Sequence, residues 1–224
     1  MAARADDVVN VCFHGIGAPG RKLEPGEDAY WVTEAAFAAA LDLVADRPEV
    51  RISFDDGNAS DVAVGLPALV ERGLTGTFFL LAGRVGAPGS VDADGVRALV
   101  EAGMTIGSHG LAHRPWVEVT GDERDAELRQ ARERLSSLAG VPVDTAACPL
   151  GRYDRRVLAD LKALGYRTVY TSDRRRSRAG AWLQHRYSVR AGDTPATLRG
   201  DVLEPPSPVE RGLAALKGKV KEMR

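Results

Sequence analysis

Short apolar, β-branched runs alternate along this chain with longer segments of helical periodicity, and this alternation limits the fold more than any other feature. Each run has the length and composition of a buried strand. Because repeated strand and helix units place the strands parallel to one another, an α/β fold is predicted. About seven such units favour a closed or nearly closed barrel, although the pattern also allows an open doubly wound sheet. The predicted strands cover residues 8–14, 49–54, 75–81, 103–109, 144–149, 167–173 and 186–190.

The size and charge of the chain exclude several classes of protein. Its 224 residues, 44% of them hydrophobic, suffice for one substantial core and predict a single domain. A net charge of −1 disfavours nucleic acid as a partner, since that role requires a strong positive field. There is no run of ~18 apolar residues and no apolar core of a secretory signal, so we expect no stable membrane insertion and a cytoplasmic location. Residues 205–224 are predicted to form a C-terminal helical extension that docks on the barrel or, alternatively, touches a membrane surface.

The first motif with candidate catalytic residues is Ser-Phe-Asp-Asp-Gly at 53–57, at the end of a predicted strand. In barrels and open α/β sheets, functional sites are built at the C-terminal ends of strands. A turn at Gly57 can direct the carboxylates of Asp55 and Asp56 toward one centre. The alternative is a solvated Asp-Asp-Gly turn without a function.

The second motif is Ser-His-Gly-Leu-Ala-His at 108–113, again at the end of a predicted strand. His109 and His113 are four residues apart, so one helical turn would place both imidazoles on the same face, where they can bind one metal ion. The alternative is a packed or exposed pair of histidines. Two of the four histidines of the chain fall within this motif, which argues against a chance pairing.

The two motifs together supply two imidazoles, one carboxylate ligand and one spare carboxylate. Such a ligand set leaves coordination positions open, as catalytic zinc-type sites do, and the spare carboxylate would serve as a base. Cys12 and Cys148 lie in apolar, strand-like runs, so both are predicted to be buried apolar residues rather than metal ligands.

With these motifs in this order, the sequence resembles the polysaccharide deacetylase family, also called the NodB-homology or carbohydrate esterase family 4 group. The resemblance includes Phe-His-Gly at 13–15 and Cys-Pro-Leu-Gly-Arg-Tyr-Asp at 148–154. It implies a distorted, TIM-like (β/α)7 barrel and a hydrolase that removes N-acetyl groups from an amino sugar in a glycan, glycolipid or glycoconjugate. It also implies a divalent metal, zinc before cobalt or another ion, and Asp55 as the general base. The metal ligands implied by the resemblance are Asp56, His109 and His113.

The third matching segment supplies further candidates under this resemblance. The backbone N–H of Leu150 would stabilise the oxyanion, and Pro149 and Tyr153 would contact the substrate. His185 matches the position of the histidine that protonates the leaving amine, although it lies at the N-terminal end of the last predicted strand. Many relatives carry an arginine that orients the catalytic aspartate where this chain has Ala147, so we expect the base to be oriented differently here.

Four other features are candidates for substrate binding. His14 ends the first predicted strand at the face where sites form. Asp173 could bind a sugar hydroxyl or cap a turn, and Trp116 could stack on a sugar ring or pack in the core. The arginine run at 174–178 could grip a phosphate or uronate, or form a solvated loop. The sequence leaves open whether the Gly/Pro-rich loop at 15–28 closes over the substrate.

The expected partner is thus an N-acetylated carbohydrate. One alternative keeps the metal centre and changes the substrate to a non-sugar amide or imide. Another is a carbohydrate-binding protein that has the same fold without turnover. The complete set of base and ligands argues against the second alternative, because a binding module needs no base beside three ligands.

Overall fold

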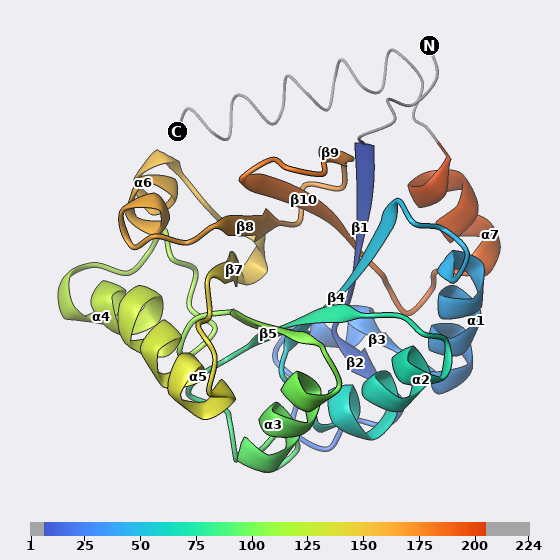
Figure 1. Ribbon diagram of the computed structural model, residues 1–224, viewed down its shortest axis with the longest axis horizontal. Helices are drawn as coiled ribbons and strands as arrows, with labels where there is room; N and C mark the ends of the chain where they lie inside the picture. Colours follow the sequence, from blue (N-terminus) through green and yellow to red (C-terminus); the bar gives the residue numbers. More distant parts are fainter. Residues whose placement is uncertain (1–6, 205–224) are drawn as a thin grey trace.

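The structure, a computed structural model, describes residues 7–204 and is built around a barrel of parallel strands (Figure 1). Each barrel strand pairs in parallel with the next, and β10 pairs with β1, so the sheet is closed. This confirms the predicted distorted (β/α)7 barrel as a single α/β domain. Around the barrel, the strands are β1 (Asp7–Phe13), β4 (Val50–Asp56), β5 (Gly76–Leu80), β6 (Thr105–Ser108), β7 (Thr145–Ala147), β8 (Thr168–Thr171) and β10 (Leu183–Ser188).

The helices lie outside the barrel (Figure 1). The side chain of Thr33 accepts a hydrogen bond from the N–H of Ala36 at the start of α1, and Gly140 ends α5 in the left-handed conformation. The α-helices are α1 (Glu34–Val44), α2 (Leu66–Glu71), α3 (Ala93–Glu101), α4 (Gly121–Asp125), α5 (Ala131–Ala139), α6 (Arg155–Ala163) and α7 (Pro195–Thr197). The remaining elements are β2 (Gly15–Ile16), β3 (Trp31–Val32), β9 (Ser177–Arg178), 3-10 turns at Glu27–Tyr30 and Pro149–Gly151, and π-helical segments at Asp61–Gly65, Ala126–Gln130 and Leu198–Leu203.

Alternation along the strands separates an apolar core from a polar barrel interior, because successive side chains point to opposite sides. On β1, Val9 and Phe13 belong to the main apolar cluster between strands and helices. The ring of Phe13 packs edge-on against Phe37 of α1, with 4.9 Å between centroids. The intervening Asn10 faces inward and donates to the side-chain oxygen of Gln184 at 3.0 Å. The barrel interior can therefore hold polar and charged groups, provided that they are paired.

The last barrel strand differs from its predicted bounds of 186–190. Parallel pairing with β8 begins at Leu183, so β10 covers Leu183–Ser188. His185 consequently lies within the strand rather than before it.

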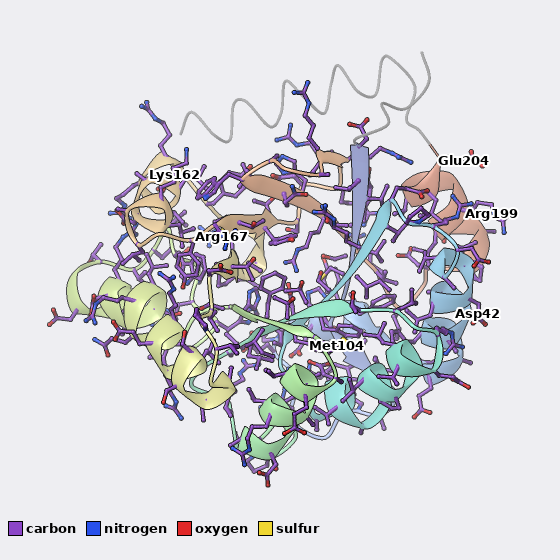
Figure 2. The ribbon with its side chains drawn as sticks, viewed as in Figure 1. Asp42, Met104, Lys162, Arg167, Arg199 and Glu204 are labelled. Atoms are coloured by element: carbon purple, nitrogen blue, oxygen red, sulfur yellow. The ribbon has the colours of Figure 1, made fainter. Side chains whose placement is uncertain are left out.

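Charged side chains such as those of Lys162 and Arg199 lie exposed on the outer helices (Figure 2). Within residues 7–204, no helix is both long enough and apolar enough to cross a membrane. The helical extension predicted for 205–224 lies outside the described residues.

Candidate active site

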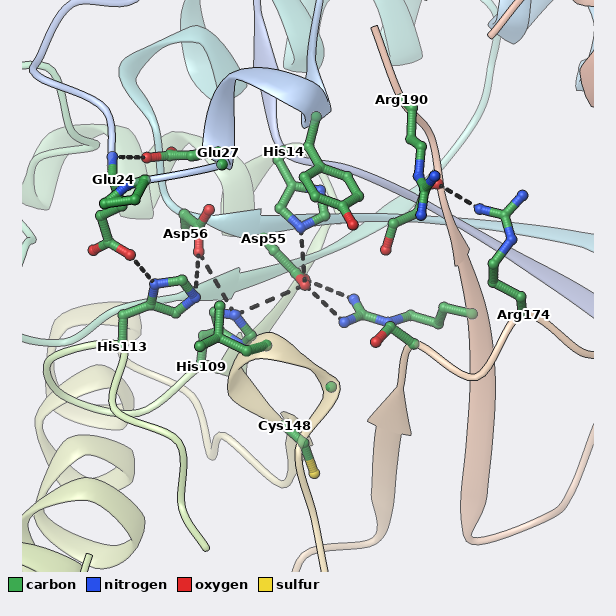
Figure 3. A pocket seen from close by; sticks show the side chains of 18 residues that line it. His14, Glu24, Glu27, Asp55, Asp56, His109, His113, Cys148, Arg174 and Arg190 are labelled. Carbon is green, nitrogen blue, oxygen red and sulfur yellow. Dashed lines mark hydrogen bonds and ion pairs between the residues drawn. The ribbon is translucent and has the colours of Figure 1, made fainter. Parts of the chain in front are cut away.

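A pocket opens at the C-terminal ends of the barrel strands and brings the sequence motifs together (Figure 3). Its walls come from β4 and β10 and from the segments that follow β1, β2, β6, β7, β8 and β10. The lining residues that the sequence singled out are His14, Asp55, Asp56, His109, His113, Leu150 and Arg174, and Glu24, Tyr30, Arg186 and Arg190 line the pocket beside them.

Three side chains present ligand atoms to a common point. Oδ1 of Asp56 lies 3.6 Å from Nε2 of His109 and 3.5 Å from Nε2 of His113. Ligand atoms of a tetrahedral zinc ion with bonds of about 2.0–2.1 Å lie about 3.3 Å apart, so these separations fit a single ion. Oδ1 of Asp56 is buried and has no hydrogen-bond partner within residues 7–204. Because burying an unpaired carboxylate oxygen is costly, a cation at this point would satisfy it.

The protonation state of His109 suits a metal ligand. Burial lowers its pKa to about 4, and this effect outweighs the opposing influence of Asp55 and Asp56. The imidazole is therefore neutral at pH 7. Its Nδ1 lies 2.9 Å from the carbonyl oxygen of Ala147 and donates to it, which leaves the lone pair on Nε2, the atom that faces Asp56.

The imidazole of His113 is oriented by a carboxylate from the loop at 15–28. Its Nδ1 lies 2.7 Å from Oε2 of Glu24, and Arg84 pairs with the other oxygen of this carboxylate. Burial alone would raise the pKa of Glu24, but the contacts with His113 and Arg84 leave it below its ordinary value. A carboxylate behind a metal-binding imidazole fixes the tautomer and raises the basicity of the ligand. The loop thus reaches the pocket and supports one of the candidate ligands.

The backbone between the two histidines is held by Glu127, a buried residue of a π-helical turn. Its carboxylate accepts hydrogen bonds from the N–H groups of Leu111 and Ala112 at 2.8 and 3.0 Å. A Cβ added to Gly110 would collide with this carboxylate and with Trp116, and Gly110 has a φ of 87°. The glycine is therefore required by both packing and backbone conformation.

Asp55 forms a buried, bidentate ion pair with Arg186 of β10. The two nitrogens lie 2.6 and 2.7 Å from the carboxylate oxygens, and the residues are 3% and 1% exposed. Burial would raise the pKa of Asp55, but Arg186, together with His109, holds it well below the ordinary value. The carboxylate is therefore ionised at neutral pH, as a base must be. Arg186 supplies the partner that Ala147 cannot.

A second group of ligand atoms, from Cys12, His14 and Asp55, lies within 4.8 Å of one another. Burial raises the pKa of the Cys12 thiol, so it stays protonated. Arg186 already engages both oxygens of Asp55. A cation there would meet a guanidinium and a neutral thiol, so this group does not fit a metal site.

The non-glycine residues with positive φ also lie at this pocket, which is evidence independent of the motifs. Among the described non-glycine residues, positive φ is confined to Asp56 (75°), His113 (58°), Leu150 (55°) and Arg174 (50°). All four line the pocket. This conformation is costly for residues with a Cβ and concentrates at functional sites.

Leu150 lies in a 3-10 turn on the pocket wall. The hydrogen bonds of this turn are donated by the N–H groups of Gly151 and Arg152, at 3.0 and 3.1 Å. A Cβ on Gly151 would collide with Ser172, so only glycine allows the turn to approach the segment after β8 this closely. Pro149, in the same turn, is buried and does not line the pocket.

The structure places His185, Asp173 and Tyr153 outside the pocket lining. Because the neighbouring Gln184 and Arg186 face the barrel interior, the ring of His185 points outward. Its Nδ1 lies 3.3 Å from Oδ2 of Asp173, which also accepts a hydrogen bond from the hydroxyl of Tyr153 at 2.6 Å. The three side chains form a network behind the pocket wall.

Trp116 is also absent from the pocket. Its ring is fully buried in the smaller apolar cluster with Leu128 and Tyr166, so it cannot stack on a sugar. Of the two roles that the sequence left open for this residue, the structure assigns it to the core.

The sequence profile of the polysaccharide deacetylase family matches residues 43–169, more than half of the chain. The matched segment contains the candidate metal ligands Asp56, His109 and His113 and the neighbouring carboxylate of Asp55. The chain belongs to the polysaccharide deacetylase family, whose members are hydrolases that act on carbon–nitrogen bonds.

Solved structures share the fold at low sequence identity. The Streptococcus pyogenes deacetylase PplD is 19% identical with a TM-score of 0.76, and the match covers 89% of this chain and 99% of PplD. The de-N-acetylase of Aggregatibacter actinomycetemcomitans is 14% identical with a TM-score of 0.72, and the match covers 88% of this chain and all of that one, 100%. IcaB of Ammonifex degensii is 21% identical with a TM-score of 0.68, and the match covers 86% of this chain and 94% of IcaB. No curated protein matches the sequence.

The motifs did not indicate the residues that support the base and the candidate ligands, namely Arg186, Glu24 and Glu127. A signal for Arg186 exists, since an arginine inside a predicted barrel strand needs a buried carboxylate, and Asp55 lacked the partner expected at Ala147. Glu24 and Glu127 lie in a polar loop and on an amphipathic helix, where glutamate is ordinary. Nothing in the sequence distinguishes them.

Proposed function

We propose that this protein is a metal-dependent hydrolase that removes an N-acetyl group from an amino sugar in a glycan, glycolipid or glycoconjugate. The proposal rests on Oδ1 of Asp56, which has no hydrogen-bond partner among residues 7–204 and faces Nε2 of both His109 and His113. The ionised carboxylate of Asp55 lies beside this point, with Oδ2 3.8 Å from Nε2 of His109. A base next to an open metal site is an arrangement that promotes amide hydrolysis.

The residues of the pocket have separate roles in this reaction. Asp56, His109 and His113 would hold a divalent ion, zinc or alternatively cobalt, which supplies Lewis acidity and a nucleophile at neutral pH when bound. Asp55 takes the proton of the attacking water, and Arg186 keeps it ionised and oriented. The backbone N–H of Leu150 then donates to the carbonyl oxygen as negative charge develops on it.

His14 protonates the leaving amine in this proposal. This residue lines the pocket, and its Nε2 lies 3.9 Å from Oδ2 of Asp55. Its ring is supported by Tyr30, with 5.0 Å between centroids. Because 3.9 Å exceeds hydrogen-bond reach, a proton taken up by Asp55 would cross to His14 through an intervening water and pass from His14 to the amine. His185, which the family resemblance suggested for this step, lies behind the pocket wall.

Family membership supports an N-acetylated sugar as the substrate. Two of the structural relatives add to this: PplD is a deacetylase studied in complex with acetate, and the Aggregatibacter protein is a de-N-acetylase.

The test is acetate release from zinc- or cobalt-loaded protein across N-acetylated sugars, N-acetylated glycolipids and cyclic amides. We expect release from at least one sugar class, and none from protein stripped of metal by a chelator. Hydrolysis of cyclic amides alone would move the reaction to a non-sugar substrate. Stoichiometric metal without hydrolysis of any compound would contradict the deacetylase assignment and favour a carbohydrate-binding role.

A further inference from the structure

Two arginines at the pocket have no part in the proposed reaction. Arg174 follows β8, Arg190 follows β10, and both line the pocket. They lie on the side of Asp55 that faces away from His113 (Figure 3). Both residues are exposed, so a ligand in the pocket can reach them.

Both guanidinium groups are held in place by neighbouring groups. Arg174 donates to the carbonyl oxygen of Ser188 at 3.2 Å and lies over the ring of Tyr187, 5.7 Å from its centroid. Arg190, two residues beyond Ser188, lies over the ring of Tyr30 at 5.7 Å. An arginine that is already restricted by stacking loses less entropy when it binds a ligand.

No carboxylate of the described residues balances the charge of these two arginines. Within residues 7–204, neither guanidinium forms an ion pair, and Asp193 accepts a hydrogen bond only from the backbone N–H of Arg190. The acidic side chains of the pocket face other partners: Asp55 pairs with Arg186, Glu24 with Arg84 and His113, Glu27 with Arg21, and Asp56 faces the two histidines.

The backbone at Arg174 is strained in the same way as the backbone of the reaction centre. Its φ of 50° places it with Asp56, His113 and Leu150 among the described non-glycine residues of positive φ. The other three carry two of the metal ligands and the candidate oxyanion donor. Because such strain persists where structure over-determines a functional position, it points to a role for Arg174 in the same pocket.

We propose that Arg174 and Arg190 bind an anionic group, a phosphate or a carboxylate, which the substrate carries close to its acetamido group. This inference rests on the proposed deacetylase function, because that function makes the bound ligand a substrate. A guanidinium presents paired N–H donors that match the oxygens of either anion. Since the arginines and the candidate metal site line one pocket, the anion belongs to the N-acetylated sugar itself or to its immediate neighbour.

The experiment compares equilibrium binding of three probes to zinc-loaded protein: an N-acetylhexosamine, its phosphate ester, and an N-acetylhexosaminuronic acid. We expect the wild type to prefer one acidic probe over the neutral sugar, and the probe preferred distinguishes phosphate from carboxylate. In the double variant Arg174→Gln/Arg190→Gln, this preference falls about tenfold or more, because two charge-assisted contacts are lost. The matched control is Arg134→Gln, an exposed residue of α5 outside the pocket lining, which keeps the preference.

Equal affinity for acidic and neutral probes, or a preference that survives in the double variant, overturns the proposal. The second result would show that the anion binds the metal ion rather than the arginines. Acetate release from the same probes separates this proposal from the proposed function. If no sugar is hydrolysed but the arginine-dependent preference is present, the anion site stands and the deacetylase assignment fails. If acetate is released without that preference, the deacetylase assignment stands and the anion site fails.

Discussion

Replacing Arg186 with glutamine removes one partner of the buried ion pair that holds Asp55. Both residues are almost completely buried, and the carboxylate loses two hydrogen bonds of 2.6 and 2.7 Å. Breaking a buried pair in this way costs about 3–5 kcal/mol, because the remaining carboxylate stays buried without its countercharge. We therefore expect Arg186→Gln to lower the free energy of unfolding by an amount in this range.

The pH dependence of this variant gives a sharper signature. In the wild type, the folded pKa of Asp55 lies below the unfolded value of ~3.9, so the pair stabilises the protein above that pH and the effect is lost in acid. Without Arg186, burial dominates and raises the folded pKa. The folded state then favours the protonated carboxyl, so the free energy of unfolding of the variant falls as pH rises from about 4 toward 7. The pH below which kcat/KM falls in acid also rises, since the base stays protonated up to a higher pH.

The assay is urea unfolding at several pH values together with a pH profile of acetate release. The double variant Asp55→Asn/Arg186→Gln should lose this pH-dependent destabilisation, because the unpaired charge is gone. Arg167→Gln, an exposed arginine, is the control and should change neither quantity. If Arg186→Gln unfolds with the wild-type pH dependence and its kcat/KM falls in acid at the wild-type pH, the ion pair does not set the protonation state of Asp55.

Three further outcomes follow from the pocket. Glu24→Ala removes the carboxylate behind His113 and should weaken zinc affinity about 10- to 100-fold in a chelator competition; unchanged affinity would remove the loop from the metal site. Gly110→Ala forces a Cβ against Glu127 at positive φ and should lower the free energy of unfolding by about 1–3 kcal/mol in urea, and a neutral result would contradict the packing argument. His14→Asn should lower kcat by about tenfold or more at unchanged metal content; an unchanged kcat would show that another group protonates the amine.

The fold was predictable because its signals are local. Buried parallel strands need continuous apolar runs, and these runs are present at each barrel strand. The motif residues were predictable for a related reason: Asp55, Asp56 and His109 stand at or next to strand ends, and parallel strands of a barrel carry these ends to one face.

Contacts between distant segments were not predictable in this way. Asp55 and Arg186 are 131 residues apart, and they meet only because β10 pairs with β1 to close the barrel. Glu24 and His113 are separated by 89 residues. His185 shows why a shift of one residue along a strand matters. It is adjacent to Arg186 in β10, so the side chain of Arg186 faces inward and that of His185 faces outward. Tertiary pairing alone decides which of them reaches the pocket.

The proposed reaction depends on one metal ion held by Asp56, His109 and His113 beside a separate base, Asp55. It is tested most directly by measuring metal content and acetate release together in the wild type, Asp55→Asn and His113→Ala, with the exposed Asp94→Asn of α3 as control. We predict one ion per chain in the wild type, the control and Asp55→Asn. Turnover in Asp55→Asn should fall by about 10²- to 10⁴-fold, whereas His113→Ala loses both metal and activity. Full activity in Asp55→Asn would contradict the role of Asp55 as base, and stoichiometric metal in His113→Ala would contradict the proposed ligand set.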